Sequence, residues 1–219
     1  MTILAVTGLR KEAEIVGIAH VVAVAGGGDA AALAEKLQAL HGDIKGVISI
    51  GLAGGLSPHL KVADVVIGEQ VIGDEIFRCD NAWRVRLAAR LPKAHCGPVT
   101  GSDFILAGAE SKTALYEKTG ALAVDMESQV AARFAKARGL PLAVLRVISD
   151  DARHTLPPAA LVAMKPDGGI ALGRVLKSLL RHPLQVPALI RTARTSKRAF
   201  AELLRCRDLC GVGLAGLDG

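Results

Sequence analysis

The sequence predicts an α/β protein: a three-layer α/β/α sandwich in which helices cover both faces of a mixed, mainly parallel twisted sheet. Short runs that are apolar throughout alternate along the chain with amphipathic helical patterns, which is typical of a buried parallel sheet. Glycine-rich or acidic segments follow several of these runs. Ligands in such folds bind at the carboxyl ends of the strands, so these segments are where we expect a site.

The elements follow one another in a regular order. Strand 3–7 precedes helix 11–18, strand 20–25 precedes helix 29–41, and strands 46–50 and 62–72 precede helix 81–91. In the second half, strand 94–101 precedes helix 107–118, strand 121–124 precedes helix 127–138, and strand 142–148 precedes helices 168–181 and 187–207.

Length and composition favour a globular protein. The 219 residues are 51% hydrophobic, enough for a substantial core. We expect one catalytic domain over residues 1–182 and a basic amphipathic helix and tail over residues 183–219. No apolar stretch reaches the roughly 18 residues of a membrane-spanning helix, and the N-terminal charges follow the first apolar run, which predicts a cytoplasmic protein. The four cysteines lack metal-type spacing, so we expect reduced thiols and no metal.

Positive charge is concentrated in the tail. The formal net charge is +6, and residues 174–208 hold nine Lys or Arg against two acids, so the rest of the chain is close to neutral. A basic amphipathic helix either lies on an anionic membrane surface or packs on its own domain with a solvated basic face. The apolar stripe is Leu189, Ala193, Phe200 and Leu203, and the basic stripe is Arg191, Arg194, Arg198 and Arg205. With 3% aromatic residues and no recognition motif, nucleic acid is not expected as a partner.

Three glycine-rich segments end the first three strands: "TGLRKE", "AGGGDAAA" and "SIGLAGGLS". Backbone N–H groups of such loops can converge on an anion or a sugar, although one loop alone is more often a tight turn. A fourth segment, "VTGSDFILAGAE", places Phe104 and Ile105 after a strand. These residues either cap the core or form a platform for a planar base.

Acidic residues end two further strands, in "ALAVDMES" and "LAVLRVISDD". An unpaired buried carboxylate is costly, so these acids need a structural or a chemical reason. Asp125 and Glu127 can cap the following helix, and Asp150 can be a turn residue. The alternative is a pair of catalytic carboxylates in different environments.

Taken in order, Glu12, "GLAGGL", "TGSDFI", "VDMES" and "RVISDD" resemble the purine nucleoside phosphorylase and nucleosidase superfamily over about residues 1–150. Within it, this region is most similar to the methylthioadenosine/S-adenosylhomocysteine nucleosidases. The resemblance implies a nucleoside phosphorylase-like fold, cleavage of a purine–ribose bond, no cofactor, and a homodimer or higher homo-oligomer. Two features depart from it: residues 18–21 look shortened, and the tail differs from the nucleosidases.

The resemblance also implies roles for the acids. Glu127 would hold the ribose hydroxyls and face the cationic sugar, with Met126 packed on the sugar. Asp150 would share or donate a proton at the purine N7, for which its pKa must rise toward neutrality, and Ser149 would orient it. Asp125 is expected to be structural.

The nucleophile stays open at this point. If it is water, Glu12 stands where the nucleosidases have an activating glutamate. If it is inorganic phosphate as co-substrate, the expected ligands are Gly8, Arg10, Gly26, Gly27, Gly28 and Arg146. Arg146 can contact phosphate or Glu12, or form a strand-end ion pair. Leu52 stands where both branches commonly have a serine.

The tail "LLRHPLQVPALIRTARTSKRAFAELLRC" resembles the hopanoid-associated phosphorylases. That resemblance implies phosphorolytic release of adenine from a lipid-linked adenosine, reached from the inner face of the membrane by a peripherally bound enzyme. Water-dependent nucleosidase activity is the first alternative. A nucleoside-binding sensor without turnover is the second, which Leu52 favours and the retained Glu127 and Asp150 disfavour.

Overall fold

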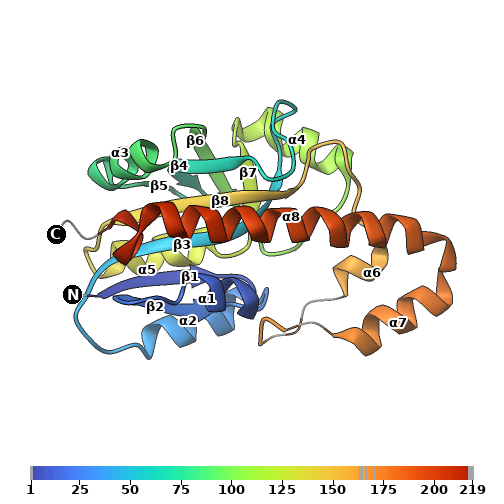
Figure 1. Cartoon of the computed structure of the whole chain (residues 1–219), viewed down its shortest axis with the longest axis horizontal. Helices are drawn as coiled ribbons and strands as arrows, with labels where there is room; N and C mark the ends of the chain where they lie inside the picture. Colours follow the sequence, from blue (N-terminus) through green and yellow to red (C-terminus); the bar gives the residue numbers. More distant parts are fainter. Residues whose placement is uncertain (1, 163–164, 166, 170, 217–219) are drawn as a thin grey trace.

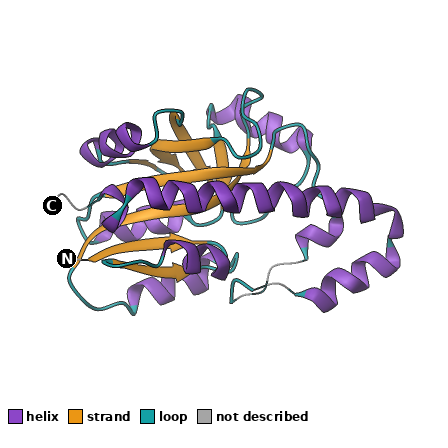
Figure 2. Cartoon of the chain, in the orientation of Figure 1, coloured by secondary structure: helices purple, strands orange, loops and turns teal. Residues whose placement is uncertain are grey.

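The computed structural model of this chain describes residues 2–162, 165, 167–169 and 171–216. Within these residues, one eight-stranded sheet lies between helices on both of its faces (Figure 1, Figure 2). Five strand pairs are parallel and three are antiparallel. The predicted three-layer α/β/α fold with a mixed, mainly parallel sheet is confirmed.

The predicted strands and helices are present with shifted ends. The strands are β1 (Thr2–Thr7), β2 (Val21–Ala25), β3 (Ile44–Gly55), β4 (Val65–Ile72), β5 (Ile76–Arg78), β6 (His95–Gly101), β7 (Ala123–Asp125) and β8 (Leu142–Asp150). The helices are α1 (Arg10–Val16), α2 (Ala30–Gln38), α3 (Asn81–Arg90), α4 (Ala109–Thr119), α5 (Ser128–Ala137), α6 (Pro158–Leu161), α7 (Leu172–Arg181) and α8 (Val186–Cys210), with 3-10 turns η1 (Pro183–Gln185) and η2 (Val212–Ala215). Strand β5 and helix α6 were not predicted. The helix expected at 168–181 begins at Leu172, and residue 170 lies outside the described residues.

Strand β3 is the centre of the sheet. It pairs with β1 and β8 in parallel and with β7 antiparallel. Further pairs join β8 to β4, β4 to β6 and β6 to β7, so β3, β8, β4, β6 and β7 close into a ring. At the end of β3, Gly54 lies opposite Val124 of β7 and Asp150 of β8. The two acidic strand ends therefore meet at one rim of the sheet.

Two apolar cores fill the space on either side of the sheet. Side chains of α1, α3 and α8 pack on one face, and those of α2 and α5 pack on the other. Helix α8 is 25 residues long, and its second half is part of the first core, with Ala199, Leu203, Cys206 and Cys210 buried. The residues expected as an appended tail thus contribute to the packing of the domain, as in the alternative in which the helix packs on its own domain.

The first half of α8 continues beyond the end of the sheet, where α6 and α7 lie beside it (Figure 1). We call α6, α7, η1 and residues 186–198 of α8 the annex. The loop before α7 contacts the β1–α1 loop: the Arg10 N–H donates to the Gly168 carbonyl oxygen at 3.0 Å. No helix in the described part of the chain is both long and apolar enough to cross a bilayer.

Candidate active site

The ends of β1, β3, β7 and β8 surround a cavity of about 700 Å³. Glu12 reaches it from the first turn of α1, Met126 and Glu127 follow β7, and Ser149 and Asp150 end β8. Other residues expected at the site also line it, namely Gly8, Phe104 and Ile105. The structure thus brings together all three acids to which catalytic roles were assigned, although Glu12 is more than one hundred residues away from the other two in the sequence.

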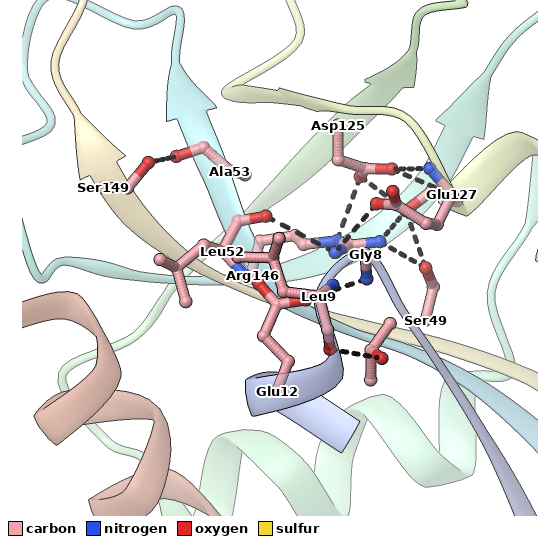
Figure 3. A network of polar contacts seen from close by, with 12 residues as sticks. Gly8, Leu9, Glu12, Ser49, Leu52, Ala53, Asp125, Glu127, Arg146 and Ser149 are labelled. Atoms are coloured by element: carbon pink, nitrogen blue, oxygen red, sulfur yellow. Dashed lines mark hydrogen bonds and ion pairs between the residues drawn. The ribbon is translucent and has the colours of Figure 1, made fainter. Parts of the chain in front are cut away.

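Arg146 of β8 holds the acidic end of the cavity together (Figure 3). Its side chain is fully buried, with Nε 3.0 Å from Asp125 Oδ2 and Nη1 3.7 Å from Glu127 Oε2. Its Nη2 donates to the hydroxyls of Ser49 and Ser128. A buried arginine needs partners for its charge and for its donors. The two acids balance the charge and the hydroxyls accept from Nη2, whereas Nε lies near Asp125 without forming a hydrogen bond. Of the alternatives for Arg146, the ion pair is the one observed, and its partners are Asp125 and Glu127.

Asp125 has a structural position, as expected. Its Oδ1 accepts hydrogen bonds from the backbone N–H groups of Glu127 at 2.8 Å and of Ser128 at 2.6 Å, which is a cap on α5. The Ser128 hydroxyl donates to the other oxygen, Oδ2, at 2.6 Å. These bonds and the Arg146 contact fix the β7–α5 turn, and so the position of Glu127.

Glu12 and Glu127 are buried carboxyl groups in unlike surroundings. Glu12 accepts hydrogen bonds from the backbone N–H groups of Gly8 and Leu9, each at 2.8 Å, and of Leu52 at 2.9 Å. Burial raises the pKa of Glu12, while these donors and Arg146 act against the rise. Burial also raises the pKa of Glu127, to about 8, because nearby Asp125 and Glu12 add to the effect and Arg146 only partly offsets it. This shift favours the protonated form of Glu127 near neutral pH.

Two glycines make room for these carboxyl groups. A Cβ on Gly8 would lie 2.8 Å from Glu127 Oε1. Gly51 has a φ of +155°, and a Cβ there would lie 2.8 Å from the Glu12 carboxyl carbon. Larger residues at either position would displace an acid, so the close approach of backbone to carboxylate explains the glycine after β1 and the glycine within β3.

Asp150 lies next to a lysine that the sequence did not reveal. Lys112 of α4 is fully buried, and its Nζ contacts Asp150 Oδ2 and donates to the carbonyl oxygens of Asp151 at 2.9 Å and His154 at 3.0 Å. Ser149 Oγ donates to Asp150 Oδ1 at 2.8 Å, so its expected orienting contact is present. The proton-donor role expected of Asp150 depended on partial burial; the carboxyl group is partly buried, and it is also paired with the ammonium group of Lys112, which was not predicted.

Most of the groups expected to hold phosphate already have partners within the protein. The Gly8 N–H donates to Glu12, the Gly26 N–H to the Thr7 oxygen at 2.8 Å, and the Gly27 N–H to the Gly8 oxygen at 2.8 Å. The Arg10 guanidinium points to solvent, where it pairs with Asp167 at 2.8 Å, and it does not line the cavity. Gly27 and Gly28 line a second cavity of about 390 Å³, together with Phe104, Ile105 and Met126.

The cavity changes character away from the acids. Its far part lies in the annex, where the lining is mainly apolar and comes from α7 and α8: Leu172, Val175, Leu189 and Ala193, with Phe200 of α8 next to them. Three of the four residues of the apolar stripe expected on α8 thus face this cavity, and the fourth, Leu203, is buried in the core. The apolar stripe of α8 is therefore not available to lie on a membrane. Among the described residues, no three His, Cys, Asp or Glu gather where they could hold a metal ion.

Comparisons with known proteins agree with this architecture. The sequence model of the phosphorylase superfamily matches residues 4–181. A 5'-methylthioadenosine/S-adenosylhomocysteine nucleosidase of Baumannia cicadellinicola is 28% identical over 127 residues, which are 48% of this chain and 56% of that protein, so the match spans only about half of the relative's length.

Solved structures share the fold at low sequence identity. The methylthioadenosine/S-adenosylhomocysteine nucleosidase of Streptococcus pneumoniae, bound to a transition-state inhibitor, superposes with a TM-score of 0.64 at 21% identity over 93% of this chain and 100% of that one. The futalosine hydrolase of Helicobacter pylori gives 0.63 at 17% identity, over 94% and 97%. With a family match over most of its length and this fold, the chain belongs to the phosphorylase superfamily.

Proposed function

We propose that the protein cleaves the N-glycosidic bond of an adenine nucleoside, with water as the nucleophile and a bulky apolar group at the 5′ position. The observation that carries this proposal is one cavity lined by Glu12, Glu127 and Asp150 at one end and by apolar residues of the annex at the other. The nucleosidase relatives make an adenine nucleoside the substrate class to test first.

Bond cleavage leaves positive charge on the ribose and negative charge on the departing base, and an enzyme accelerates the reaction by stabilising both. Glu127 faces the ribose in this proposal. Its ionised form complements the sugar cation, and its position is fixed by Arg146 and by the Asp125 cap. Met126 packs on the sugar, and Phe104 and Ile105 lie against the base.

The base leaves toward Asp150. The C1′–N9 bond breaks, its electron pair goes to the purine, and N7 takes or shares a proton that Asp150 relays from solvent. Lys112 stabilises the negative charge that Asp150 carries before and after the transfer, and Ser149 fixes the orientation of the carboxyl group. Lys112 is in this account a positioning residue, since it acts through Asp150.

Water attacks C1′ and loses its proton to Glu12. Burial raises the pKa of Glu12, which makes its carboxylate a better base, and three backbone donors hold it in place. Leu52 contributes its backbone N–H to this arrangement, so the missing serine hydroxyl does not leave Glu12 unsupported.

Phosphorolysis is the second candidate, and the resemblance of the tail to the hopanoid-associated phosphorylases favours it. The occupied N–H groups of Gly8, Gly26 and Gly27, and the Arg10–Asp167 pair, weigh against it. A dianionic phosphate would also meet two buried acids whose only close arginine, among the described residues, is already paired. For these reasons we place water first.

The apolar group at the 5′ position is a lipid in this proposal, and the resemblance of the tail suggests a hopanoid. The annex supports it, because an apolar cavity wall stabilises a ligand in proportion to the apolar area that it removes from water. A cytoplasmic location and a homo-oligomeric state remain predictions. Cell fractionation and sedimentation velocity test them.

Adenine release tests the proposal. Adenosine and two 5′-thio analogues, one with a methyl and one with a long alkyl group, are assayed with and without phosphate. We expect release without phosphate and the highest kcat/KM for the alkyl analogue. Release that requires phosphate would establish the phosphorylase. Tight binding of the nucleoside without adenine release would establish a sensor and would overturn both hydrolysis and phosphorolysis.

A further inference from the structure

Helix α7 exposes a row of leucines on the outer side of the annex. Leu172, Leu176 and Leu180 recur every four residues and so share one face of the helix, and Leu184 follows in η1. We call these four residues the leucine face. Leu180 is 78% exposed and Leu184 is 94% exposed, values that a leucine rarely has unless something else covers it.

Positive charge accompanies the leucine face on α7, where Arg174, Lys177 and Arg181 are exposed. The part of α8 that belongs to the annex also exposes Arg191, Arg194 and Arg198. Residues 171–201 contain no Asp or Glu. A second copy of this chain docked through the same face would bring like charges together, whereas an anionic partner would complement them.

We propose that the leucine face docks the protein on an anionic membrane surface, with the leucines in the interfacial layer and the cations of α7 at the lipid headgroups. Amphipathic helices with leucine on one side and lysine or arginine on the other bind membranes in this way. The surface differs from the one expected from the sequence, which was α8, because the apolar stripe of α8 is turned toward the cavity and the core.

The docking surface adjoins the candidate active site. Leu172 belongs to both: it is exposed at the start of the leucine face and lines the cavity that leads to Glu127. A lipid-linked nucleoside can thus pass from the bilayer along α7 to the acids. This link to the substrate rests on the proposed function, but the docking itself does not.

Sedimentation of the full chain with vesicles tests the docking without any need for turnover. We expect binding to phosphatidylglycerol-rich vesicles at low salt, much weaker binding to pure phosphatidylcholine, and loss of binding as salt screens the cations. Leu176→Ser/Leu180→Ser and Lys177→Glu/Arg181→Glu should each lower the bound fraction about ten-fold or more, since they remove the two contributions separately.

Two exposed residues outside the annex supply matched controls: Val85→Ser on α3 and Lys93→Glu in the loop after it should bind as the unchanged protein does. Circular dichroism confirms that every variant is folded. The proposal is overturned if the full chain does not bind anionic vesicles at low salt, or if the α7 variants bind them as well as the unchanged protein does. It is also overturned if these variants only turn an oligomer into monomers, which would make the leucine face a subunit interface. Turnover of adenosine, which needs no membrane, separates failure of docking from failure of the proposed function.

Discussion

The two ends of the cavity are built in opposite ways. At the rim of the sheet, the charged groups are buried or partly buried and form ion pairs, Arg146 with Asp125 and Glu127, and Lys112 with Asp150, while backbone and hydroxyl groups complete their contacts. In the annex, the cavity wall is mainly apolar. Its outer surface has exposed leucines, and residues 171–201 carry lysine and arginine but no acidic residue. The charged groups of the rim are fixed in position, as bond cleavage requires. The annex instead provides an apolar surface against which a substituent of the substrate can pack. We infer that the rim sets the reaction and the annex selects the group carried by the nucleoside.

The largest effect should come from the proposed base at the rim. Glu12→Gln keeps the shape of the side chain but cannot accept the proton of water, so kcat/KM for adenine release should fall about 10²–10⁴-fold. Glu14→Gln changes an exposed glutamate on the same helix and should leave the rate unchanged. Equal rates for both variants would remove Glu12 from the mechanism.

Breaking the buried pair at Asp150 should mainly affect folding. Lys112→Met leaves a buried carboxylate without its cation, which costs about 3–5 kcal/mol of the free energy of unfolding. Lys118→Met on the exposed side of the same helix should cost no more than about 0.5 kcal/mol. Urea denaturation measures both. Adding Asp150→Asn to Lys112→Met should recover part of the loss, and the absence of any recovery would contradict a pairwise contact.

Glu127 should make stability depend on pH. Its pKa in the folded protein is raised to about 8 from an ordinary 4.5, so its contribution is fully present below about pH 4.5 and is lost as the pH rises through 8. Glu127→Gln cannot ionise and should therefore gain in free energy of unfolding over the unchanged protein across that interval. Urea denaturation at several pH values measures the gain. A constant difference between the two proteins would show that Glu127 titrates normally.

A change in the annex should alter substrate choice and not chemistry. Val175→Glu places a charge on the apolar wall, so KM for a nucleoside with an alkyl group at the 5′ position should rise about ten-fold while kcat for adenosine stays the same. Val85→Glu on exposed α3 is the matched control. Equal losses for adenosine and the alkyl analogue would contradict the division between rim and annex.

The smallest effect is expected at Arg10. Its pair with Asp167 is exposed to solvent, so Arg10→Ala should lower the free energy of unfolding by less than about 1 kcal/mol. Adenine release and its response to added phosphate should stay as they are. If turnover of the variant instead requires a higher phosphate concentration, Arg10 contacts the nucleophile. That result would support phosphorolysis over hydrolysis.

The sequence predicted which acids converge, but the reason differs from the one expected. Carboxyl ends of parallel strands meet at one rim, yet β7 runs antiparallel to β3 and β8 runs parallel to it, so this rule does not bring Glu127 and Asp150 together. They meet because Gly54, at the end of β3, is paired with Val124 of β7 and with Asp150 of β8. Lys112 could not be predicted: it sits in a helix with charged neighbours, and only the packing of α4 over the end of β8 turns its side chain inward. The ring of β3, β8, β4, β6 and β7 was also missed, because it depends on antiparallel pairs between segments distant in sequence.

Helix α8 is a second example of what a sequence pattern cannot predict. The helical spacing of its apolar residues predicted the apolar stripe correctly, but spacing does not identify what packs against a stripe. In the structure this stripe faces the cavity and the core. The leucines of α7 lie on a helix that the sequence predicted almost correctly, yet their exposure follows only from the way the annex projects beyond the sheet (Figure 1).

Isotope transfer from the solvent tests the central claim most directly. The protein is incubated with a 5′-alkylthio adenosine in ¹⁸O-water without phosphate, and the products are weighed by mass spectrometry. The account predicts free adenine and a sugar that carries one solvent oxygen at C1′ from the moment of cleavage, at a rate that added phosphate does not change. A sugar phosphate formed only when phosphate is present, or no adenine at all, would contradict it.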